Sequence, residues 1–450
     1  MEKSLPKGWV ESNIGTISEI IRGVSYKKNE ASSSYSEHSI YILRGGNIQD
    51  GRIDFETDDN VYVKSHLVNP KQYIQKDDVV IVGSTGSKKL IGKAGTAGDK
   101  LANVSFGAFL MLLRTYTVNS KYHSYFFQTA YYRNTISELA GGVNINNIRK
   151  EHLENLKFPL PPLPEQERIV AKLDKLFAQH EKIKQALDRI PQLLKAFRQQ
   201  VLTQAVTGKL TEQWREGKDL EGWKAKKISE LGELISGFAF KSSDFKDAGI
   251  QLIRMGNLYN NKLDLARSPI FLPKDYDAKL IERYSTQKGD ILLSLTGTKY
   301  KRDYGFAIEI DTNEKLLINQ RILCVRPSIN SKYLLYLLRD NIFRDQFFAL
   351  ETGGVNQGNV GVTNLAKISL KIPPLQEQQE IVRRVENLFA KADAIEARYD
   401  TLKAKVDSLP QAILHKAFKG ELVPQLPTDG DAKDLLAEIM ALKKDVKERK

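Results

Sequence analysis

Residues Pro162–Gln166 have the sequence Pro-Leu-Pro-Glu-Gln and open a long stretch in which apolar residues follow a helical pattern. Residues Pro374–Gln378, with the sequence Pro-Leu-Gln-Glu-Gln, open a second such stretch 212 residues later. Proline fixes φ and biases the residue before it away from the helical region, so each segment marks a boundary where a long helix can begin. The chain is therefore expected to consist of a globular part and a long helix, followed by a second copy of both.

The apolar residues in each long stretch recur in alternating steps of four and three, which is a heptad pattern. A heptad stripe of this length needs a facing partner in water. We therefore expect the two helices to pair with each other as an antiparallel coiled coil. Pro191 and Pro410 fall inside these helices and are expected either to kink them or to remove a hydrogen bond. The residues expected between the helices are Ile169, Leu173, Leu176, Leu187, Leu194, Ile381, Val385, Leu388, Ile395 and Leu402.

Composition limits the class of protein. The chain has 450 residues, of which 41% are hydrophobic, so it can bury several cores. Lys and Arg exceed Asp and Glu by 68 to 55, and this excess favours a polyanionic partner such as nucleic acid or an anionic membrane surface. No apolar run approaches membrane-spanning length, and the N-terminus has no signal-peptide pattern. The single cysteine, Cys324, lies in an apolar run and is expected to be a buried, inert thiol. These features predict a cytoplasmic protein.

An internal duplication extends beyond the long helices. Short motifs recur at offsets of 210 to 214 residues, among them Gly8-Trp9 with Gly222-Trp223, Arg44–Ile48 with Arg254–Leu258, and Lys76–Val80 with Lys288–Leu292. The domain boundaries predicted from this repeat are a first globular domain at 1–160, a first helix at 161–210, a second globular domain at 211–372, a second helix at 373–422, and a C-terminal tail with a short helix at 423–450.

Each globular domain is predicted to be mixed α and β. Short β-branched runs indicate strands at 39–43, 78–82 and 108–114 in the first copy, and at 251–254, 290–294 and 322–326 in the second. A helical pattern follows at 122–139 and again at 333–350, and each of these patterns ends at a Gly-Gly pair.

The sequence lacks the motifs that most enzymes require. The segment Gly83–Lys88 has the glycine and lysine of a phosphate-binding loop without its spacing, and no dinucleotide-binding glycine motif follows a strand. There is no Asn-Pro-Pro-aromatic or Asp-Pro-Pro-aromatic tetrapeptide of an amino-methyltransferase, and the six histidines have no metal-ligand spacing. We therefore predict no catalytic residue, no metal site and no cofactor bound by this chain.

Basic and polar loops occupy matching places in the two domains. Cations and hydroxyls can hold DNA phosphates, whereas Asn, Gln and Arg can read base edges in the major groove. Such residues also make ordinary surface turns, so for any single loop both interpretations stay open, and the recurrence favours DNA binding for the set. The candidate DNA-binding residues are Arg22, Tyr26, Lys27, Lys28, Arg44, Asn47, Ser84, Thr85, Ser87, Lys88, Lys89, Asn144, Asn146 and Asn147 in the first domain, and Lys241, Arg254, Asn257, Thr296, Thr298, Lys299, Lys301, Arg302, Asn356, Gln357 and Asn359 in the second.

The motifs around the long helices resemble those of specificity subunits of type I restriction–modification enzymes. The residues that carry the resemblance are Pro161–Gln166 with Ala205–Arg215, and the second copy at Pro373–Val382. The segment Ile21–Lys28 also resembles the enterobacterial-type members. The second copy departs from the first at Gln376, in place of Pro164, and at Glu421, in place of Lys209. The resemblance covers essentially the whole chain.

The resemblance implies a non-catalytic subunit with two target-recognition domains, each reading one half of a bipartite site in double-stranded DNA. It implies two methyltransferase subunits, which carry S-adenosylmethionine and methylate adenine N6, and two restriction subunits, which use ATP and Mg²⁺. It also implies that the helices Glu165–Thr207 and Glu377–Lys419 set the spacer and dock the methyltransferase subunits. Two rival hypotheses are a coiled-coil adaptor without a DNA role and a self-sufficient methyltransferase or nuclease, the latter disfavoured by the missing motifs.

Overall fold

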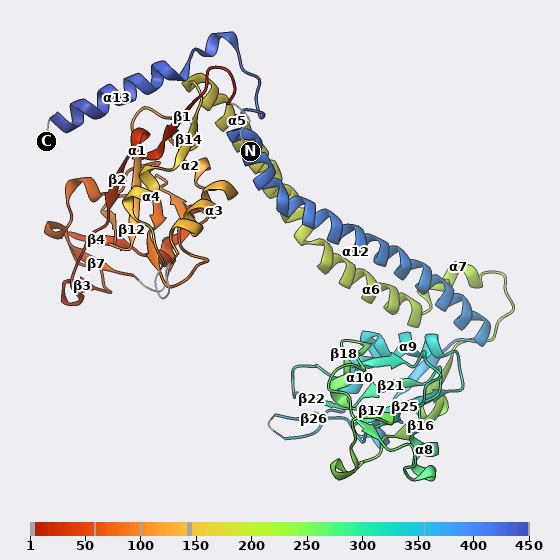
Figure 1. Cartoon of the computed structure of the whole chain (residues 1–450). Coiled ribbons are helices and arrows are strands. Elements are labelled where there is room, and N and C mark those ends of the chain that lie inside the picture. The colour runs from red at the N-terminus through yellow and green to blue at the C-terminus, as the bar shows by residue number, and fades with distance from the viewer. Residues whose placement is uncertain (1–4, 58–59, 100, 142–145, 355, 449–450) are drawn as a thin grey trace. The chain divides into compact units, whose positions relative to one another are not determined.

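The computed structural model describes residues 5–57, 60–99, 101–141, 146–354 and 356–448, and Figure 1 shows its ribbon. The chain forms two compact units. The first unit combines Met1–Leu187 with Leu402–Lys450, and the second unit is Asp188–Thr401. Each unit contains one globular domain together with parts of the long helices, so the first unit is discontinuous in sequence.

The first domain is built on two β-sheets. Its central strand, β8 (Val79–Val82), is buried at every position, as expected for a strand covered on both faces. The six-stranded sheet has the order β2 (Ser18–Arg22), β12 (Leu110–Thr115), β8, β10 (Ala94–Thr96), β6 (Gly51–Ile53), β5 (Ile48–Gln49). The four-stranded sheet has the order β11 (Val104–Phe106), β4 (Ser39–Leu43), β7 (Tyr62–Lys64), β3 (Ala31–Ser32). Two further pairs join β1 (Val10–Asn13) to β14 (Lys157–Leu160) and β9 (Ser84–Thr85) to β13 (Asn146–Asn147).

The α-helices of the first unit come from both of its sequence segments. They are α1 (Ile14–Ile17), α2 (Ser120–Phe126), α3 (Ala130–Leu139), α4 (Lys150–Glu154), α5 (Leu163–Asp188), the last part of α12 (Leu375–Phe418), and α13 (Ala432–Glu448). The single helix expected at 122–139 is instead two helices. The break is capped by Thr129, whose hydroxyl oxygen accepts a hydrogen bond from the backbone N–H of Tyr132 at 3.2 Å.

The second domain repeats the central part of this topology in smaller sheets. Its main sheet has the order β16 (Gly232–Ser236), β25 (Ile322–Pro327), β21 (Ile291–Ser294), β23 (Ala307–Glu309), and a second sheet has the order β20 (Phe271–Leu272), β17 (Ile250–Ile253), β24 (Leu317–Ile318). The remaining pairs are β15 (Lys224–Lys227) with β27 (Ser369–Ile372), β18 (Leu258–Tyr259) with β19 (Lys262–Leu263), and β22 (Thr296–Gly297) with β26 (Gly358–Asn359).

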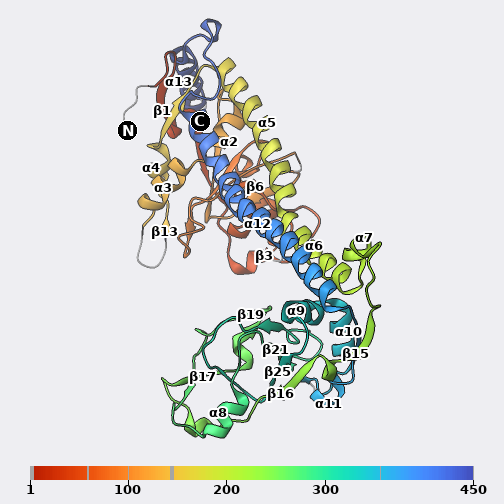
Figure 2. The ribbon, with the colours of Figure 1, turned by 90° about the vertical axis from the view of Figure 1, so that its right-hand side faces the viewer.

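The helices of the second unit are α6 (Ile190–Val206), α7 (Glu212–Arg215), α8 (Ala278–Tyr284), α9 (Ser331–Arg339), α10 (Asn341–Ala349), α11 (Val362–Leu365) and the first part of α12. In Figure 2, α9 and α10 lie on the side of the domain that faces α6, and α8 lies at the opposite end. The expected helix at 333–350 is again two helices. The break occurs at the buried Asp340, whose carboxylate caps α10 and accepts hydrogen bonds from Gln199 and Thr203 of α6.

One ion pair between neighbouring strands recurs in both domains and explains a repeated motif. Asp78 pairs with Arg114 at 2.6 Å in the first domain, and Asp290 pairs with Arg326 at 3.1 Å in the second. Both carboxylates are buried, with side chains 2% exposed. A buried charge needs such a partner, so the aspartate in Lys76–Val80 and Lys288–Leu292 has a structural role.

The two long helical stretches differ in continuity. The first is divided into α5 and α6, and Pro191 lies at the start of α6, where a missing N–H leaves no helical bond unmade. The second is the single 44-residue helix α12, which contains Pro410 in its interior. The two prolines therefore differ in position: Pro191 lies at the start of α6, whereas Pro410 lies inside the continuous helix α12.

The helices pack together in antiparallel fashion within each unit, which confirms the predicted α+β fold. In the second unit, Arg198 of α6 pairs with Glu396 of α12 at 2.8 Å. Leu210 lies after Arg198 in the sequence, and its carbonyl accepts a hydrogen bond at 2.9 Å from Arg384, which lies before Glu396. The two segments therefore run in opposite directions. In the first unit, a ring nitrogen of His180 lies 2.9 Å from the Val406 carbonyl oxygen. The first turns of α5 and the last turns of α12 share the first domain's core, and the corresponding turns of α12 and α6 share the second domain's core.

The predicted helix-pair residues divide into buried and exposed groups. Ile169, Leu173, Leu187, Leu194, Ile381 and Val385 are buried, and Leu176 and Leu388 are half-buried. Ile395 and Leu402 are instead 50% and 47% exposed, so they do not lie in the core. Val385, Ala392 and Val406 of α12 are buried, and the heptad position between the last two, Tyr399, is half-buried. Residues three positions further along are rotated by about 60° around the helix, which turns Ile395 and Leu402 toward solvent.

A buried Glu–Gln pair at the start of each long helix attaches that helix to its own domain. In the first unit, the Glu165 carboxylate accepts a hydrogen bond from the Trp9 indole at 2.9 Å. The Gln166 amide donates to the Pro161 carbonyl at 2.8 Å, and its oxygen accepts from the backbone N–H of Asn119 at 2.9 Å. Glu165 and Gln166 are 1% and 0% exposed, and burial raises the pKa of Glu165. The motif that marks the helix boundary therefore has a direct structural function.

The second unit repeats this attachment. Glu377 accepts from the Trp223 indole at 3.0 Å and from the Thr211 hydroxyl at 2.7 Å. The Gln378 side-chain oxygen accepts from the backbone N–H of Asn330 at 3.0 Å. Asn330 caps α9, as Asn119 caps α2 in the first unit, so each glutamine holds the residue that begins a domain helix.

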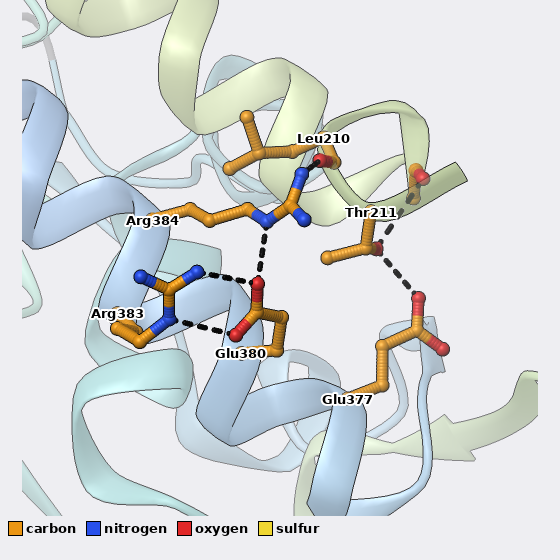
Figure 3. Close-up of polar contacts among 7 residues, drawn as sticks. Leu210, Thr211, Glu377, Glu380, Arg383 and Arg384 are labelled. Carbon is orange, nitrogen blue, oxygen red and sulfur yellow. Dashed lines mark hydrogen bonds and ion pairs between the residues drawn. The ribbon is translucent and has the colours of Figure 1, made fainter. Parts of the chain in front are cut away.

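Ionic contacts along α12 extend the attachment in the second unit (Figure 3). Glu380 accepts hydrogen bonds from Arg383 and Arg384, and these two guanidinium groups lower the pKa of Glu380 to about 2. Arg384 also donates to the carbonyl of Leu210, in the segment that follows α6. The segment after α6 is thereby bound to the first turns of α12.

In the first unit, the C-terminal tail after α12 is bound to the first turns of α5, as the segment after α6 is bound to α12 in the second unit. Arg168 of α5 forms a two-pronged ion pair with Asp429, with N–O distances of 2.6 and 2.7 Å. Beyond it, Ala432, Leu435 and Ile439 of α13 are buried in the first domain's core. In Figure 1, a loop follows the end of α12, and α13 then runs past α1 and β1. The tail is therefore part of the first unit's hydrophobic core.

We expect the substitution Gln166→Leu to destabilise the first unit. It removes two buried hydrogen bonds and leaves the N–H of Asn119 and the carbonyl of Pro161 without this partner, at a cost of about 1–3 kcal/mol for each. Denaturant unfolding followed by circular dichroism measures the loss. Gln179→Leu, on the exposed surface of α5, is the matched control and should change the free energy of unfolding by less than about 0.5 kcal/mol. Equal losses in the two variants would contradict the structural role of Gln166.

Candidate nucleic-acid interface

Loops from four parts of the first domain surround a cavity of about 470 Å³, which we call the first cleft. The loop after β2 contributes Ser25 and Tyr26, the turn after β4 contributes Arg44, and β9 contributes Ser84 and Thr85. The tip between β11 and β12, at Ala108-Phe109, completes the cleft. Four of the predicted DNA-binding residues, Tyr26, Arg44, Ser84 and Thr85, therefore lie around one cavity.

The second domain has a cavity of about 410 Å³ at the corresponding turn, which we call the second cleft. The turn after β17 contributes Arg254–Asn257, and the loop before β20 contributes Arg267 and Ser268. The tip between β24 and β25, at Asn319–Arg321, closes the other side. Three arginines line this cleft, and none of its described lining residues is acidic.

The two clefts are built on the same backbone frame. The N–H of Gly107 donates to the carbonyl of Leu43 at 2.9 Å, and that of Asn319 donates to the carbonyl of Ile253 at 3.0 Å. A Cβ atom on Gly23 would meet the Gly107 carbonyl oxygen at 2.1 Å, which backbone atoms cannot accommodate. The same close approach excludes a side chain at Gly237 beside Asn319. Glycine at these repeated positions is thus needed to bring the loop after the first sheet strand against the tip.

Two predicted DNA-binding residues, Asn47 and Asn257, have structural roles in the turns that line the clefts. Asn47 is 1% exposed, and its side chain accepts from the N–H of Arg44 at 2.7 Å. Asn257 is 3% exposed and accepts from the N–H of Arg254 at 2.9 Å. Their amides are used to close the Arg-x-Gly-Asn turns, so we propose no base contact for either side chain.

The short strand pairs beside the clefts bring together other predicted residues. Thr85 pairs with Asn146 in β9–β13, and Thr296 pairs with Asn359 in β22–β26. Asn146 and Thr296 are 4% and 5% exposed, so we propose no DNA contact for their side chains. Thr85 is half-buried and Asn359 is exposed.

The remaining predicted residues lie on the surface around these features. Arg22, Lys27, Lys28, Lys88, Lys89 and Asn147 are exposed and Ser87 is half-buried in the first domain, whereas Asn144 falls outside the described residues. In the second domain Lys241, Lys301, Arg302, Asn356 and Gln357 are exposed, and Thr298 and Lys299 are half-buried. Two of the cations already have partners, because Arg302 pairs with Asp345 at 2.9 Å and Lys299 donates to the Gly353 carbonyl at 3.3 Å. None of these residues lines either cleft.

Sequence reasoning missed the residues at the tips of the two clefts. Phe109 is 69% exposed, and Gln320 and Arg321 are exposed at the corresponding turn. Arg267 of the second cleft was missed as well. The tips are short turns between apolar strands, and they contain neither a glycine-rich run nor a cluster of charges. Their signal in the sequence is their position in the internal repeat, two residues before Met111 and Leu323 respectively.

The described residues contain no group of three His, Cys, Asp or Glu side chains placed to hold a metal ion. None of the described helices combines the length and apolar character needed to cross a membrane. Cys324 is 1% exposed, and burial raises the pKa of its thiol, as expected for an inert core residue.

Each unit also exposes apolar side chains on its long helices. In the second unit these are Leu193, Phe197 and Ile395, which are 65%, 37% and 50% exposed. In the first unit they are Ile183, Leu402 and Leu409, at 45%, 47% and 39%. We call these sets the helix patches. Exposed apolar groups that recur along a helix are typical of surfaces that bind another protein.

Comparison with known proteins assigns the chain to a family. The family described as type I restriction modification DNA specificity domain matches residues 6–192 and again residues 220–404. The type I restriction enzyme StySPI specificity subunit of Salmonella potsdam is 36% identical, over 94% of this chain and 90% of the relative. The EcoKI specificity subunit of Escherichia coli (strain K12) is 35% identical over the same shares.

A solved structure supports the same assignment at the level of the fold. The crystal structure of the HsdS subunit from Thermoanaerobacter tengcongensis aligns with a TM-score of 0.64 at 18% identity, covering 93% of this chain and 98% of that one. The duplicated domains, the paired helices and the two family matches agree with one another. The chain therefore belongs to the family of type I restriction–modification specificity subunits and carries two DNA specificity domains.

Proposed function

We propose that this chain binds double-stranded DNA and that each domain reads one half of a bipartite site through its cleft. The observation that carries the proposal is the duplicated cleft, in which equivalent turns present Arg44 and Arg254 beside exposed tips. Arginine can contact phosphates or base edges, and the chain's formal charge of +13 favours association with a polyanion. Surface cations near the clefts, such as Lys27, Lys28 and Lys88, would add phosphate contacts.

We further propose that the catalytic steps belong to partner subunits. Two methyltransferase subunits would supply S-adenosylmethionine and methylate adenine N6, and two restriction subunits would use ATP and Mg²⁺. The relatives are named as specificity subunits of type I restriction enzymes, which supports assembly with such partners. This chain would then position the methyltransferase on DNA, in the cytoplasm.

The helix patches are the surfaces that we propose for docking the methyltransferase subunits. One patch in each unit matches a requirement for two copies of the same partner, because the two units repeat one architecture. The helix pair would in addition set the number of base pairs between the half-sites, since its length is fixed by helical geometry.

The proposed function predicts that the purified chain alone transfers no methyl group from labelled S-adenosylmethionine to DNA. Addition of the cognate methyltransferase subunit should give methylation at a bipartite sequence, read by mapping modified adenines. The methyltransferase subunit alone should show no sequence-selective methylation. Methylation by the chain alone, or unchanged selectivity without it, would contradict the proposal.

The substitution Ile395→Ser should weaken association with the methyltransferase subunit without unfolding the chain. Ile395 is half exposed, so its loss costs little in stability, whereas an apolar contact in an interface would be lost. Lys391→Ser, on an exposed position of the same helix, is the control. Pull-down or calorimetric titration measures the affinity, and equal affinities of the two variants would remove this patch from the docking surface.

Deletion of one heptad from each long helix, at 181–187 and 399–405, should shorten the spacer while leaving both half-sites unchanged. Seven residues correspond to about 10 Å of helix and therefore to about 3 base pairs. Methylation mapping with the reconstituted complex measures the spacer. Altered half-sites with an unchanged spacer would reject the role of the helices in setting the distance.

A further inference from the structure

The two clefts share a backbone frame and differ in chemistry at one corresponding tip. The first tip carries Ala108-Phe109, and the second carries Gln320-Arg321. In both domains the residue before this dipeptide is fixed by a backbone hydrogen bond to the neighbouring strand, and the residue after it donates back across the turn. The dipeptides therefore occupy equivalent positions at the edge of their clefts.

The lining of the second cleft contains donors without acceptors. Arg254 donates from one terminal nitrogen to the Ser268 carbonyl at 2.9 Å. Its Nε atom is buried and has no hydrogen-bond partner among the described residues. The exposed guanidinium of Arg321 likewise makes no hydrogen bond or ion pair with any described residue. A buried donor without a partner is unfavourable, so an acceptor-rich ligand in this cleft would relieve a cost already present.

The first cleft has the opposite character. Phe109 is 69% exposed and Leu90 is 40% exposed, and both line the cavity together with hydroxyl groups from Ser25 and Thr85. Arg44 is the one cation among its described lining residues. An exposed aromatic ring at the cleft edge offers an apolar contact rather than a hydrogen-bonding fork.

Base edges in the major groove also differ in whether they offer hydrogen-bond acceptors or an apolar group. Guanine presents two acceptors, O6 and N7, which match the paired donors of arginine. Thymine presents a methyl group, which an apolar side chain such as phenylalanine can contact. Lysine can supply the charge of arginine but not its planar fork.

We propose that Arg321, with Gln320 beside it, is a specificity-determining residue that reads a guanine in the half-site bound by the second domain. Phe109 is its counterpart and contacts a thymine methyl in the other half-site. This inference rests on the proposed function, because it names which residues of the two clefts select bases. It explains how one frame can read two different sequences.

The test uses the full chain reconstituted with its methyltransferase subunit and a library of DNA duplexes that samples each position of the mapped site. Methylation of each duplex is measured for the wild-type chain and for Arg321→Ala, Arg321→Lys and Phe109→Ala. Arg321→Ala should lower the preference for guanine at one position by roughly 10- to 100-fold, as expected for loss of a bidentate contact. Arg321→Lys should relax the same position while retaining most of the overall binding.

Phe109→Ala should change a preference for thymine, and only in the opposite half-site. Lys367→Ala is the control, because Lys367 is exposed near β27, which pairs with β15 and not with the strands that carry the cleft. It removes one positive charge and should leave every base preference unchanged. Melting temperatures of all variants verify that the exposed substitutions leave the fold intact.

The outcomes separate the inference from the proposed function. A uniform loss of methylation on all duplexes with Arg321→Ala would show a phosphate contact and overturn the reading role. Unchanged preferences, or effects of Phe109 and Arg321 in the same half-site, would also overturn it. Absence of sequence-selective methylation with the wild-type chain would instead refute the proposed function itself.

Discussion

The structure depends on one buried attachment that occurs twice, the Glu–Gln pair at the start of each long helix. The glutamate accepts a hydrogen bond from a tryptophan indole near the beginning of its domain, and the glutamine binds the backbone of the residue that caps a domain helix. All four side chains are at most 3% exposed. If these hydrogen bonds were lost, water could not replace them, and the buried polar atoms would remain without partners. The attachment therefore fixes the direction in which each helix leaves its domain, and domain and helix form one structural element.

Much of the architecture could be predicted from the sequence, because its strongest signals are repeated. The prolines before Glu165 and Glu377, the heptad spacing and the recurring glycines all concern backbone geometry, which follows general rules. The helix breaks near Thr129 and Asp340 were missed. At each break a buried side chain caps the second helix, and Asp340 also binds Gln199 and Thr203, which lie far away in sequence. Ile395 fitted the heptad but is exposed, because a pair of helices buries fewer apolar rows than the pattern contains.

The residues of the candidate interface are harder to predict from sequence, for a related reason. Asn47 has the chemistry of a base reader, yet it is needed to close a turn, and only the structure separates these two uses. Arg321 and Phe109 carry no local signal and become candidates through their place at equivalent tips. The frame of each cleft is set by close backbone contacts, whereas the tip residues are exposed and contribute little to stability. Such a division lets the exposed positions vary while the frame is retained.

The discontinuous first unit has a consequence for synthesis on the ribosome. Residues Met1–Leu187 emerge early, but the helix turns and α13 that complete their core belong to Leu402–Lys450. At typical elongation rates this interval lasts roughly tens of seconds. During that time the second unit, which is continuous in sequence, can fold to completion while the apolar surface awaiting α13 stays uncovered. Loss of α13 would therefore destabilise a domain whose strands are encoded far earlier in the sequence.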